Sequence, residues 1–307
     1  MVSLLRLGTR GSKLALVQTN LVRAALAQAV PELAAPDAIE IVTIKTTGDA
    51  IQDRPLSEAG GKGLFVKEIE EALLSGRIDG AVHSMKDMPT AQPAGLVIAA
   101  FLQREDARDV LIAGSVARIA DLKQGAIVGT SALRRRAQLL HLRPDLQIVN
   151  LRGNVDTRLA KREAGQVEAT LLALAGLKRL GMAHAGTPVP ESEMLPAVGQ
   201  GAVCIECRAG DTETRESLAA INHANTATSV TAEHAMLSVL DGSCRTPIAG
   251  HAVLTAGGLH LRALIAKPDG SQLITTERRG AAADAEALGR EAGHDLLRRG
   301  GPGFLST

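Results

Sequence analysis

Short apolar runs and stretches of helical spacing alternate along the first 220 residues of the chain. Residues 3–9 and 39–43 have the apolar pattern of strands. Between them Leu14 and Leu21 lie on the 3.6-residue period of a helix that Ser12 caps. A strand, a helix and a strand in this order form a βαβ unit, so the pattern predicts a parallel sheet.

Two candidate site residues follow the next predicted strand. A helix is predicted at 64–74 and a strand at 79–85, and this strand continues into Lys86, Asp87 and Pro89, which turns the chain. In open α/β sheets ligands bind beyond the carboxyl ends of the strands. Lys86 and Asp87 are therefore candidates for binding a charged ligand and for proton transfer, and a surface salt bridge is the alternative.

The glycine-rich segment SEAGGKG contains a further candidate, Lys62. It is not a phosphate-binding P-loop, because Leu56 and Leu64 replace the first glycine and the Ser or Thr of that motif. Free backbone N–H groups and Lys62 at a helix start suit an anion. A loop with a solvated lysine is the alternative.

The pattern restarts after a polar break at 103–108 and brings basic residues to three strand ends. Strands predicted at 126–128, 147–151 and 169–174 each lead into a helix, and Ser131 is the candidate cap of the first of these helices. These junctions carry Arg134, Arg135, Arg152, Arg158 and Arg179. Cations in a first helical turn oppose the helix dipole, and guanidinium groups bind carboxylates through paired hydrogen bonds. The pattern favours a ligand with several carboxylates over a set of unrelated surface charges.

The last third of the chain has a different pattern. A helix is predicted at 227–240, then strands at 248–254, 259–266 and 272–278, then a helix at 282–299. Short turns with glycine join the strands, as in an antiparallel meander. This part is predicted to be an α+β domain. The segment 195–208 is predicted to return to the first domain as a strand.

The chain has three cysteines, which have different surroundings. Cys244 lies among small residues in GSCRTPIAG, beside Arg245, which favours the thiolate; an idle thiol is the alternative. Cys204 and Cys207 are three apart in a predicted strand, so their side chains point to opposite faces. We therefore expect them to be structural and expect no metal site.

Composition excludes several classes of function. The chain has 34 basic and 33 acidic residues, no Trp or Tyr and three Phe, which argues against binding to nucleic acid or to a membrane surface. No apolar stretch reaches the ~18 residues of a membrane span, and the first residues do not resemble a signal peptide. We expect a cytoplasmic protein with reduced thiols.

Eight motifs in this order resemble the porphobilinogen deaminases, a family also called hydroxymethylbilane synthases. They are TRGSKLALVQT, GGKGLFVKEIE, AVHSMKDMPT, VGTSALRRRAQL, LRGNVDTRL, AGLKRLG, PAVGQGAVCIECR and GSCRTPIAG. The resemblance implies two periplasmic-binding-protein-like (type II) α/β domains with an active cleft between them, and a C-terminal α+β domain with a three-stranded antiparallel sheet. The expected domains are 1–102 plus 201–219, 107–196 and 223–307.

The resemblance also implies an activity. Such a transferase deaminates porphobilinogen, adds four units head to tail onto a covalently bound dipyrromethane cofactor, and releases hydroxymethylbilane by hydrolysis. It acts in tetrapyrrole biosynthesis as a monomer without a metal. Each porphobilinogen carries an acetate and a propionate, which matches the carboxylate-rich ligand inferred from the arginines.

The family's functional residues transfer to matching positions of this sequence. Asp87 is the expected catalytic acid and Cys244 the thioether anchor of the cofactor. The other expected cofactor contacts are Ser84, Lys86, Thr130, Ser131, Arg134, Arg135, Gly153, Arg158 and Gln200. The expected substrate contacts are Arg10, Ser12, Gln18, Lys62, Phe65, Arg152 and Arg179. Glu58 and Ala132 depart from some relatives, which have lysine and serine there.

Two other functions fit parts of the sequence. A non-catalytic anion-binding module would use the arginines but would have no need of the third domain and its cysteine. A zinc hydrolase would use Cys204 and Cys207, but the predicted strand separates them and no histidine has suitable spacing.

Overall fold

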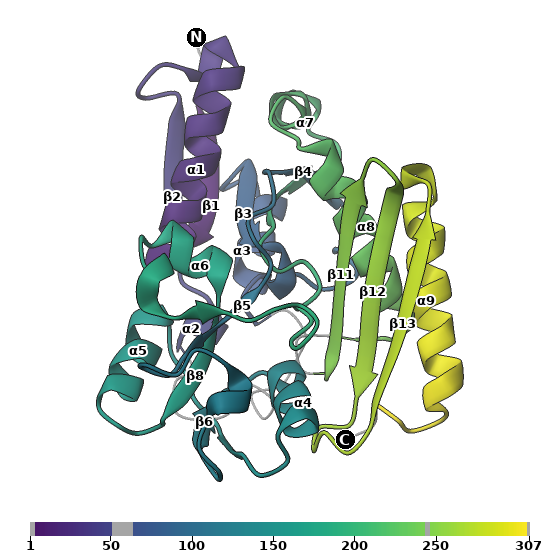
Figure 1. The fold of residues 1–307 in the computed structure, drawn as a ribbon. Helices are drawn as coiled ribbons and strands as arrows, with labels where there is room; N and C mark the ends of the chain where they lie inside the picture. The colour runs from purple at the N-terminus through teal and green to yellow at the C-terminus, as the bar shows by residue number, and fades with distance from the viewer. Residues whose placement is uncertain (1–3, 51–63, 243–245, 306–307) are drawn as a thin grey trace. The chain divides into compact units, whose positions relative to one another are not determined.

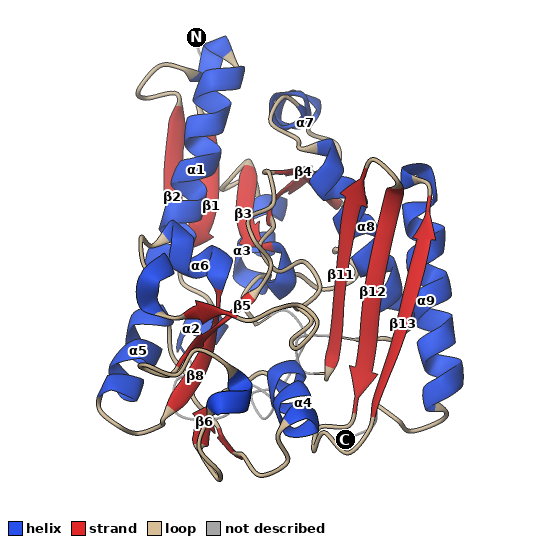
Figure 2. Cartoon of the chain, in the orientation of Figure 1, coloured by secondary structure: helices blue, strands red, loops and turns tan. Residues whose placement is uncertain are grey.

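The computed structural model of the protein describes residues 4–50, 64–242 and 246–305. The chain divides into two compact units, each built from two segments. The first unit contains Met1–Arg104 and Ala202–Ala227, and the second contains Glu105–Gly201 and Thr228–Thr307. Figure 1 follows the chain from its N-terminus to its C-terminus, and Figure 2 distinguishes its helices and strands.

The first unit contains a five-stranded sheet in the order β2-β1-β3-β10-β4. Its strands are β1 (Leu5–Arg10), β2 (Ile39–Ile44), β3 (Gly80–Ser84), β4 (Leu96–Phe101) and β10 (Val203–Arg208). Its helices are α1 (Lys13–Ala29), α2 (Thr47–Ala50), α3 (Lys67–Leu74) and α7 (Thr212–Ala219). Strand β1 pairs in parallel with β2 and β3, whereas β10 is antiparallel to β3 and β4. The predicted parallel sheet and the predicted return strand are both confirmed.

Helix α1 has the predicted cap but a different buried face. The Ser12 hydroxyl oxygen accepts a hydrogen bond from the N–H of Ala15 at 3.3 Å. The buried residues of α1 include Val22 and Leu26, whereas Leu21 is 46% exposed, so the apolar face predicted through Leu21 is wrong. Two stripes of this helix have helical spacing, and the sheet covers the stripe that also contains the polar Gln18.

The second unit contains a five-stranded sheet in the order β7-β6-β8-β5-β9. Its strands are β5 (Asp109–Ile112), β6 (Ile127–Gly129), β7 (Gln147–Val149), β8 (Ala169–Ala173) and β9 (Thr187–Pro188). The helices α4 (Leu133–Leu142), α5 (Val155–Glu163) and α6 (Leu174–Arg179) follow β6, β7 and β8. Since β6 is parallel to both β7 and β8, the three strand ends meet at one edge of the sheet. The three junctions therefore share that edge, as predicted, but Arg179 lies in the last turn of α6 and not in a first helical turn.

The second unit also contains an antiparallel sheet of three strands, β11 (Ile248–Thr255), β12 (Gly258–Ala266) and β13 (Leu273–Gly280). Helices α8 (Ala224–Val239) and α9 (Ala285–Gly300) are the helices of this part. Leu261 and Ile265 of β12 share a core with Met236 of α8 and Leu296 of α9. Figure 1 shows α9 running alongside the three strands.

Alternate residues of β12 pack against a different element. Leu264 and Ala266 share a core cluster with Ala137 of α4 and with Leu195. Successive side chains of a strand point to opposite faces, so β12 faces α8 and α9 on one side and α4 on the other. The three-stranded sheet is thereby packed against the basic helix α4.

These elements confirm the predicted mixed α/β fold with a C-terminal three-stranded antiparallel sheet. The strands β4, β5 and β9 were not predicted. The division into three domains at the boundaries given above stays a prediction, since the structure separates the chain into two units. In the part of the chain that the structure describes, no helix has the length and hydropathy that a membrane span requires.

Candidate functional site

Asp87 lies in a short 3₁₀ turn, Met85–Asp87, at the carboxyl end of β3. The Met85 side chain is buried, and its N–H donates to the carbonyl oxygen of Ala202 at 3.0 Å. Lys86 and Asp87 are half-buried. The turn is thus anchored to Ala202 of a segment distant in the sequence, while Asp87 stays partly exposed, as a residue that contacts a ligand must.

Gln18 and Ser84, two predicted contacts, lie against each other. Gln18 is 3% exposed, and its Nε2 donates to the Ser84 hydroxyl oxygen at 2.9 Å. This bond joins α1 to the last residue of β3. Gln18 therefore holds the strand end that leads to Asp87.

Arg10, Ser12 and Phe65 gather near the carboxyl end of β1. Arg10 is the last residue of that strand, and its guanidinium carbon lies 4.2 Å from the centre of the Phe65 ring. A cation over an aromatic face is stabilised by the ring's quadrupole, so Phe65 orients the Arg10 side chain. Ser12 caps the helix that follows.

Arg134 and Arg135 of α4 converge on one carboxylate that the sequence reasoning missed. Arg134 Nη1 lies 2.7 Å from Asp109 Oδ2, and Arg135 Nη2 lies 2.8 Å from Asp109 Oδ1. Asp109 has no exposed surface, and each arginine is 5% exposed. The anion that balances these first-turn cations is therefore supplied in part by the protein itself. The available signal was an acid at the first position of the apolar run DVLI.

The electrostatics of this cluster favour a further anion. Burial alone would raise the pKa of Asp109, but the two guanidinium groups outweigh burial and hold the pKa well below its usual value. Two guanidinium charges against one carboxylate leave one net positive charge. Among the described residues, the buried Nε of Arg135 has no hydrogen-bond partner. An unsatisfied buried donor costs about 1–3 kcal/mol, so the cluster is suited to an anionic acceptor.

Gln200 and Arg179 extend the same cluster. Gln200 is 1% exposed, and its Nε2 donates to Asp109 Oδ1 at 2.9 Å and to the carbonyl oxygen of Ala107 at 2.6 Å. Arg179 Nη2 donates to the carbonyl oxygen of Gly201 at 2.8 Å. Desolvation lowers the pKa of Arg179, while Glu105 acts in the opposite direction.

The junction between β7 and α5 carries Arg152, Gly153 and Arg158. Arg158 Nε donates to the carbonyl oxygen of Gly153 at 2.8 Å. Gly153 has φ +122°, a conformation that side chains rarely adopt. Asn154 caps α5, since its Oδ1 accepts the N–H of Thr157 at 2.8 Å. The glycine thus allows a tight turn that places both arginines at the edge shared with α4.

The loop before α4 differs from the prediction that Ser131 caps this helix. The N-cap residue is Ala132, which makes no side-chain capping bond, and Ser131 is exposed. The hydroxyl oxygen of the buried Thr130 accepts the N–H of Ala132 at 3.2 Å. Thr130 forms a local turn one residue earlier, which leaves the Ser131 side chain outside the capping position.

The remaining predictions concern cysteines and loops. Cys204 and Cys207 are buried on β10, and burial raises the pKa of Cys204 well above its usual value and that of Cys207 to about 11. Both are inert thiols at neutral pH. Within residues 4–50, 64–242 and 246–305, no group of His, Cys, Asp and Glu has the arrangement of a metal site. Glu58, Lys62 and Cys244 lie outside the described residues.

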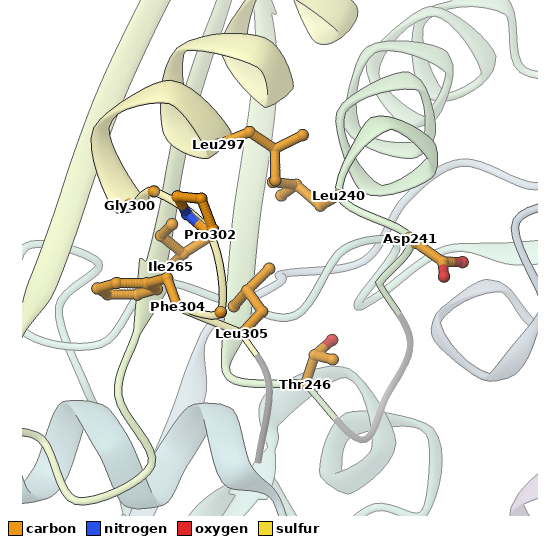
Figure 3. A pocket seen from close by; sticks show the side chains of 11 residues that line it. Leu240, Asp241, Thr246, Ile265, Leu297, Gly300, Pro302, Phe304 and Leu305 are labelled. Atoms are coloured by element: carbon orange, nitrogen blue, oxygen red, sulfur yellow. The ribbon is translucent and has the colours of Figure 1, made fainter.

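Figure 3 shows a pocket in the second unit, whose lining includes Asp241 and Thr246. Its lining comes from the two residues that follow α8, from Thr246 before β11, from β12 and α9, and from the C-terminal residues after α9: Leu240, Asp241, Thr246, Ile265, Leu297, Gly300, Gly301, Pro302, Gly303, Phe304 and Leu305. None of these lining residues is basic. The pocket therefore does not have the charge of the arginine cluster, which remains the candidate anion site of this unit.

Comparisons with known proteins agree over nearly the whole chain. The family model described as "Porphobilinogen deaminase, dipyromethane cofactor binding domain" matches residues 5–216, and "Porphobilinogen deaminase, C-terminal domain" matches 227–298. A relative named porphobilinogen deaminase from Paracoccus denitrificans is 56% identical over 98% of this chain and 96% of its own length. A chloroplastic one from Oryza sativa subsp. japonica is 51% identical over 100% of this chain and 87% of its own length.

Similar solved structures are more distant. A periplasmic substrate-binding protein of an ABC transporter from Coxiella burnetii has a TM-score of 0.43 and 16% identity, covering 71% of this chain and 92% of its own. The periplasmic VFT2 domain of Bordetella pertussis BvgS has a TM-score of 0.41 and 14% identity, covering 71% of this chain and 86% of its own.

Proposed function

The chain belongs to the porphobilinogen deaminase family, and from this premise we propose which residues carry out the family's reaction. The protein is a transferase of tetrapyrrole biosynthesis that polymerises porphobilinogen, and residues 5–216 match the family's dipyrromethane-binding domain. Each condensation breaks the carbon–nitrogen bond of a substrate aminomethyl group and releases ammonia. A carbon–carbon bond forms, and the attacking pyrrole carbon loses its proton. After four condensations water releases hydroxymethylbilane.

Asp87 is the proposed catalytic residue. Loss of ammonia from porphobilinogen leaves positive charge that spreads to the pyrrole nitrogen, and a carboxylate close to that nitrogen stabilises the charge. The same carboxyl group assists proton transfer to the leaving amine. The anchored turn at the end of β3 supports this role, because it fixes the Asp87 backbone and leaves the side chain partly exposed.

The basic side chains are the proposed anchors for carboxylates. Every pyrrole unit brings an acetate and a propionate, so the bound chain gains two negative charges at each step. In the second unit the proposed anchors are Arg134, Arg135, Arg152, Arg158 and Arg179, with Thr130, Ser131, Gly153 and Gln200 beside them. In the first unit they are Arg10, Ser12, Lys62, Ser84 and Lys86, with Gln18 and Phe65 holding their neighbours. The net positive charge around Asp109 and the orphan donor of Arg135 support this assignment.

Cys244 is the proposed attachment point of the dipyrromethane. When bound, the cofactor supplies the electron-rich pyrrole carbon to which the first substrate unit is added. The Cys244 sulfur holds it through a thioether and takes no part in the later steps. The two buried cysteines cannot easily substitute for Cys244, because their raised pKa values disfavour the thiolate.

We further propose that the protein is a cytoplasmic monomer, on the family resemblance alone.

The observation that carries the proposed roles is the position of Asp87 in the anchored turn after β3. Incubation of the purified protein with porphobilinogen tests it against a non-catalytic anion-binding module. We expect one ammonia released for every porphobilinogen consumed and a linear tetrapyrrole as product. Binding without ammonia release would reject the proposal.

A further inference from the structure

Glu233 of α8 is a completely buried acid to which the proposed reaction gives no role. It has no exposed surface. Its Oε2 accepts the N–H of Gly199 at 2.7 Å, and its Oε1 accepts the N–H of Ala252 at 2.8 Å. Hydrogen bonds to an ionised acceptor are roughly twice as strong as neutral ones. The carboxylate therefore holds two backbone segments that are far apart in the sequence.

One of these segments leads directly to the arginine cluster. Gln200, next to Gly199, donates to Asp109, which pairs with Arg134 and Arg135. The carbonyl oxygen of Gly201 accepts a hydrogen bond from Arg179. Three consecutive residues, 199–201, thus connect Glu233 with three of the proposed carboxylate anchors.

The other segment is β11, which follows Cys244 in the sequence. Cys244 lies in the sequence between the end of α8 at Val239 and the start of β11 at Ile248. Glu233 belongs to the helix that precedes Cys244 in the sequence, and its carboxylate accepts the N–H of Ala252 in the strand that follows Cys244. A second bond, from the Gly250 N–H to the Pro196 carbonyl oxygen at 3.1 Å, joins β11 to the segment that contains Gly199.

We propose that Glu233 is a positioning residue that fixes the two elements flanking Cys244 relative to the arginine cluster. The proposed cofactor is attached at Cys244, and its carboxylates are bound at the arginine cluster. The distance between Cys244 and the cluster must therefore match the length of the cofactor. Glu233 sets that separation through the 199–201 segment without touching substrate. This inference rests on the proposed roles of Cys244 and the arginines.

The test replaces Glu233 by glutamine and measures two quantities: the fraction of protein that carries the cofactor, and the kinetic constants of that fraction. Glu233→Gln keeps the size of the side chain, but its NH₂ group faces one of the two N–H donors, so that hydrogen bond is lost. A misplacement of reacting groups by about 1 Å costs up to about 100-fold in rate. In the cofactor-loaded fraction, quantified by intact mass, we expect kcat to fall about tenfold or more while KM stays within about twofold.

The matched control is Asp295→Asn, because Asp295 is another buried acid of the same region. It accepts a hydrogen bond from the Thr276 hydroxyl at 2.8 Å and belongs to α9. We expect wild-type kcat and KM for the loaded control. A loaded Glu233→Gln protein with wild-type kcat and KM, even if it melts at a lower temperature, would show a purely structural role and overturn the inference.

Hydrogen exchange decides the question if Glu233→Gln does not fold. The amides of Gly199 and Ala252 are compared in the loaded wild type and in the cofactor-free Cys244→Ser variant. If Glu233 links the elements flanking Cys244 to the arginine cluster, both amides should exchange more slowly in the cofactor-loaded protein. Equal exchange rates in the two proteins would overturn the inference. A wild type that carries no adduct and releases no ammonia would instead reject the proposed function, and the inference with it.

Discussion

Asp109 determines the charge balance of the arginine cluster. It binds Arg134 and Arg135 in a region where all three side chains are buried. The cluster is therefore part of the folded core as well as a proposed anion site. A single carboxylate does not neutralise both cations, so the fold keeps one positive charge, which we propose binds the cofactor's carboxylates.

Replacing Asp109 by asparagine should destabilise the protein strongly. Asp109→Asn leaves two buried cations without their anion, and breaking a buried ion pair in this way costs about 3–5 kcal/mol. Urea unfolding measures the loss. The control is Glu168→Gln, which removes an exposed pair with Lys123 and should change the unfolding free energy little. Losses of similar size in the two variants would contradict the structural role of Asp109.

The same variant should change the response to acid. The folded-state pKa of Asp109 is depressed, so its contribution is complete above the unfolded pKa of about 3.9 and is lost as the pH falls toward the folded value. Wild-type stability should therefore fall more steeply below about pH 4 than that of Asp109→Asn. Parallel curves would show that other carboxylates dominate.

Asp87→Asn should separate chemistry from folding. Asparagine has the same shape but neither stabilises a cation by charge nor transfers a proton at neutral pH. We expect a folded, cofactor-loaded protein whose release of ammonia from porphobilinogen is nearly abolished. Asp145→Asn, at a partly exposed pair with Arg143, is a control expected to keep full activity. Normal turnover by Asp87→Asn would remove Asp87 from its proposed role.

The sequence predicted where strands end more reliably than which side chains form ion pairs with each other. The position of Asp87 follows from an apolar run that ends at a proline-containing turn, and the structure has the anchored turn there. The contact between Asp109 and Arg134 joins residues 25 positions apart, and local pattern does not encode such pairs. The arginines were therefore explained only by an external anion, although the protein supplies part of the charge.

At the scale of elements, periodicity predicted most strands and helices but not every face or cap. In α1 the stripe with Leu21 and the stripe with Val22 both have helical spacing, and only packing against the sheet chooses between them. Before α4, Thr130 competes with Ser131 for the first free N–H groups. Strand β5 has only four residues and follows a polar break, so no clear period identifies it.

Gly153 offers a test at the junction between β7 and α5. A Cβ atom there would lie 2.6 Å from Thr157 Cγ2, and Thr157 is held by the cap residue Asn154. Gly153→Ala should therefore lose more unfolding free energy than Gly165→Ala. Gly165 also has positive φ, but its Cβ would meet no atom within 4 Å, so its replacement costs only about 1–2 kcal/mol of backbone strain. Thermal or urea unfolding compares the two, and equal losses would contradict a tight junction.

At the scale of the whole molecule, each unit is built from two chain segments. The predicted return strand explains why the first unit has two segments, because β10 lies between β3 and β4 in the sheet of that unit. The sequence pattern predicted this return strand, and it also predicted three domains. In the second unit α4 and β12 share a core cluster, so the third predicted domain packs against the second.

The proposed monomer is tested by sedimentation. The loaded protein should sediment with a mass close to that of one 31.9 kDa chain at micromolar concentration. The net charge of +1 is small, so the measurement should be repeated at two salt concentrations to exclude weak association. A mass near that of two chains in both would contradict the proposal.

The central claim is that this protein carries its cofactor on Cys244 and extends it. The most direct measurement is the intact mass of the wild type and of Cys244→Ser, each produced in cells that make porphobilinogen. The account predicts a dipyrromethane adduct on the wild type, further increments after brief incubation with porphobilinogen, and no thioether-linked adduct on Cys244→Ser. A bare wild-type chain, or a stable adduct on the serine variant, would contradict it.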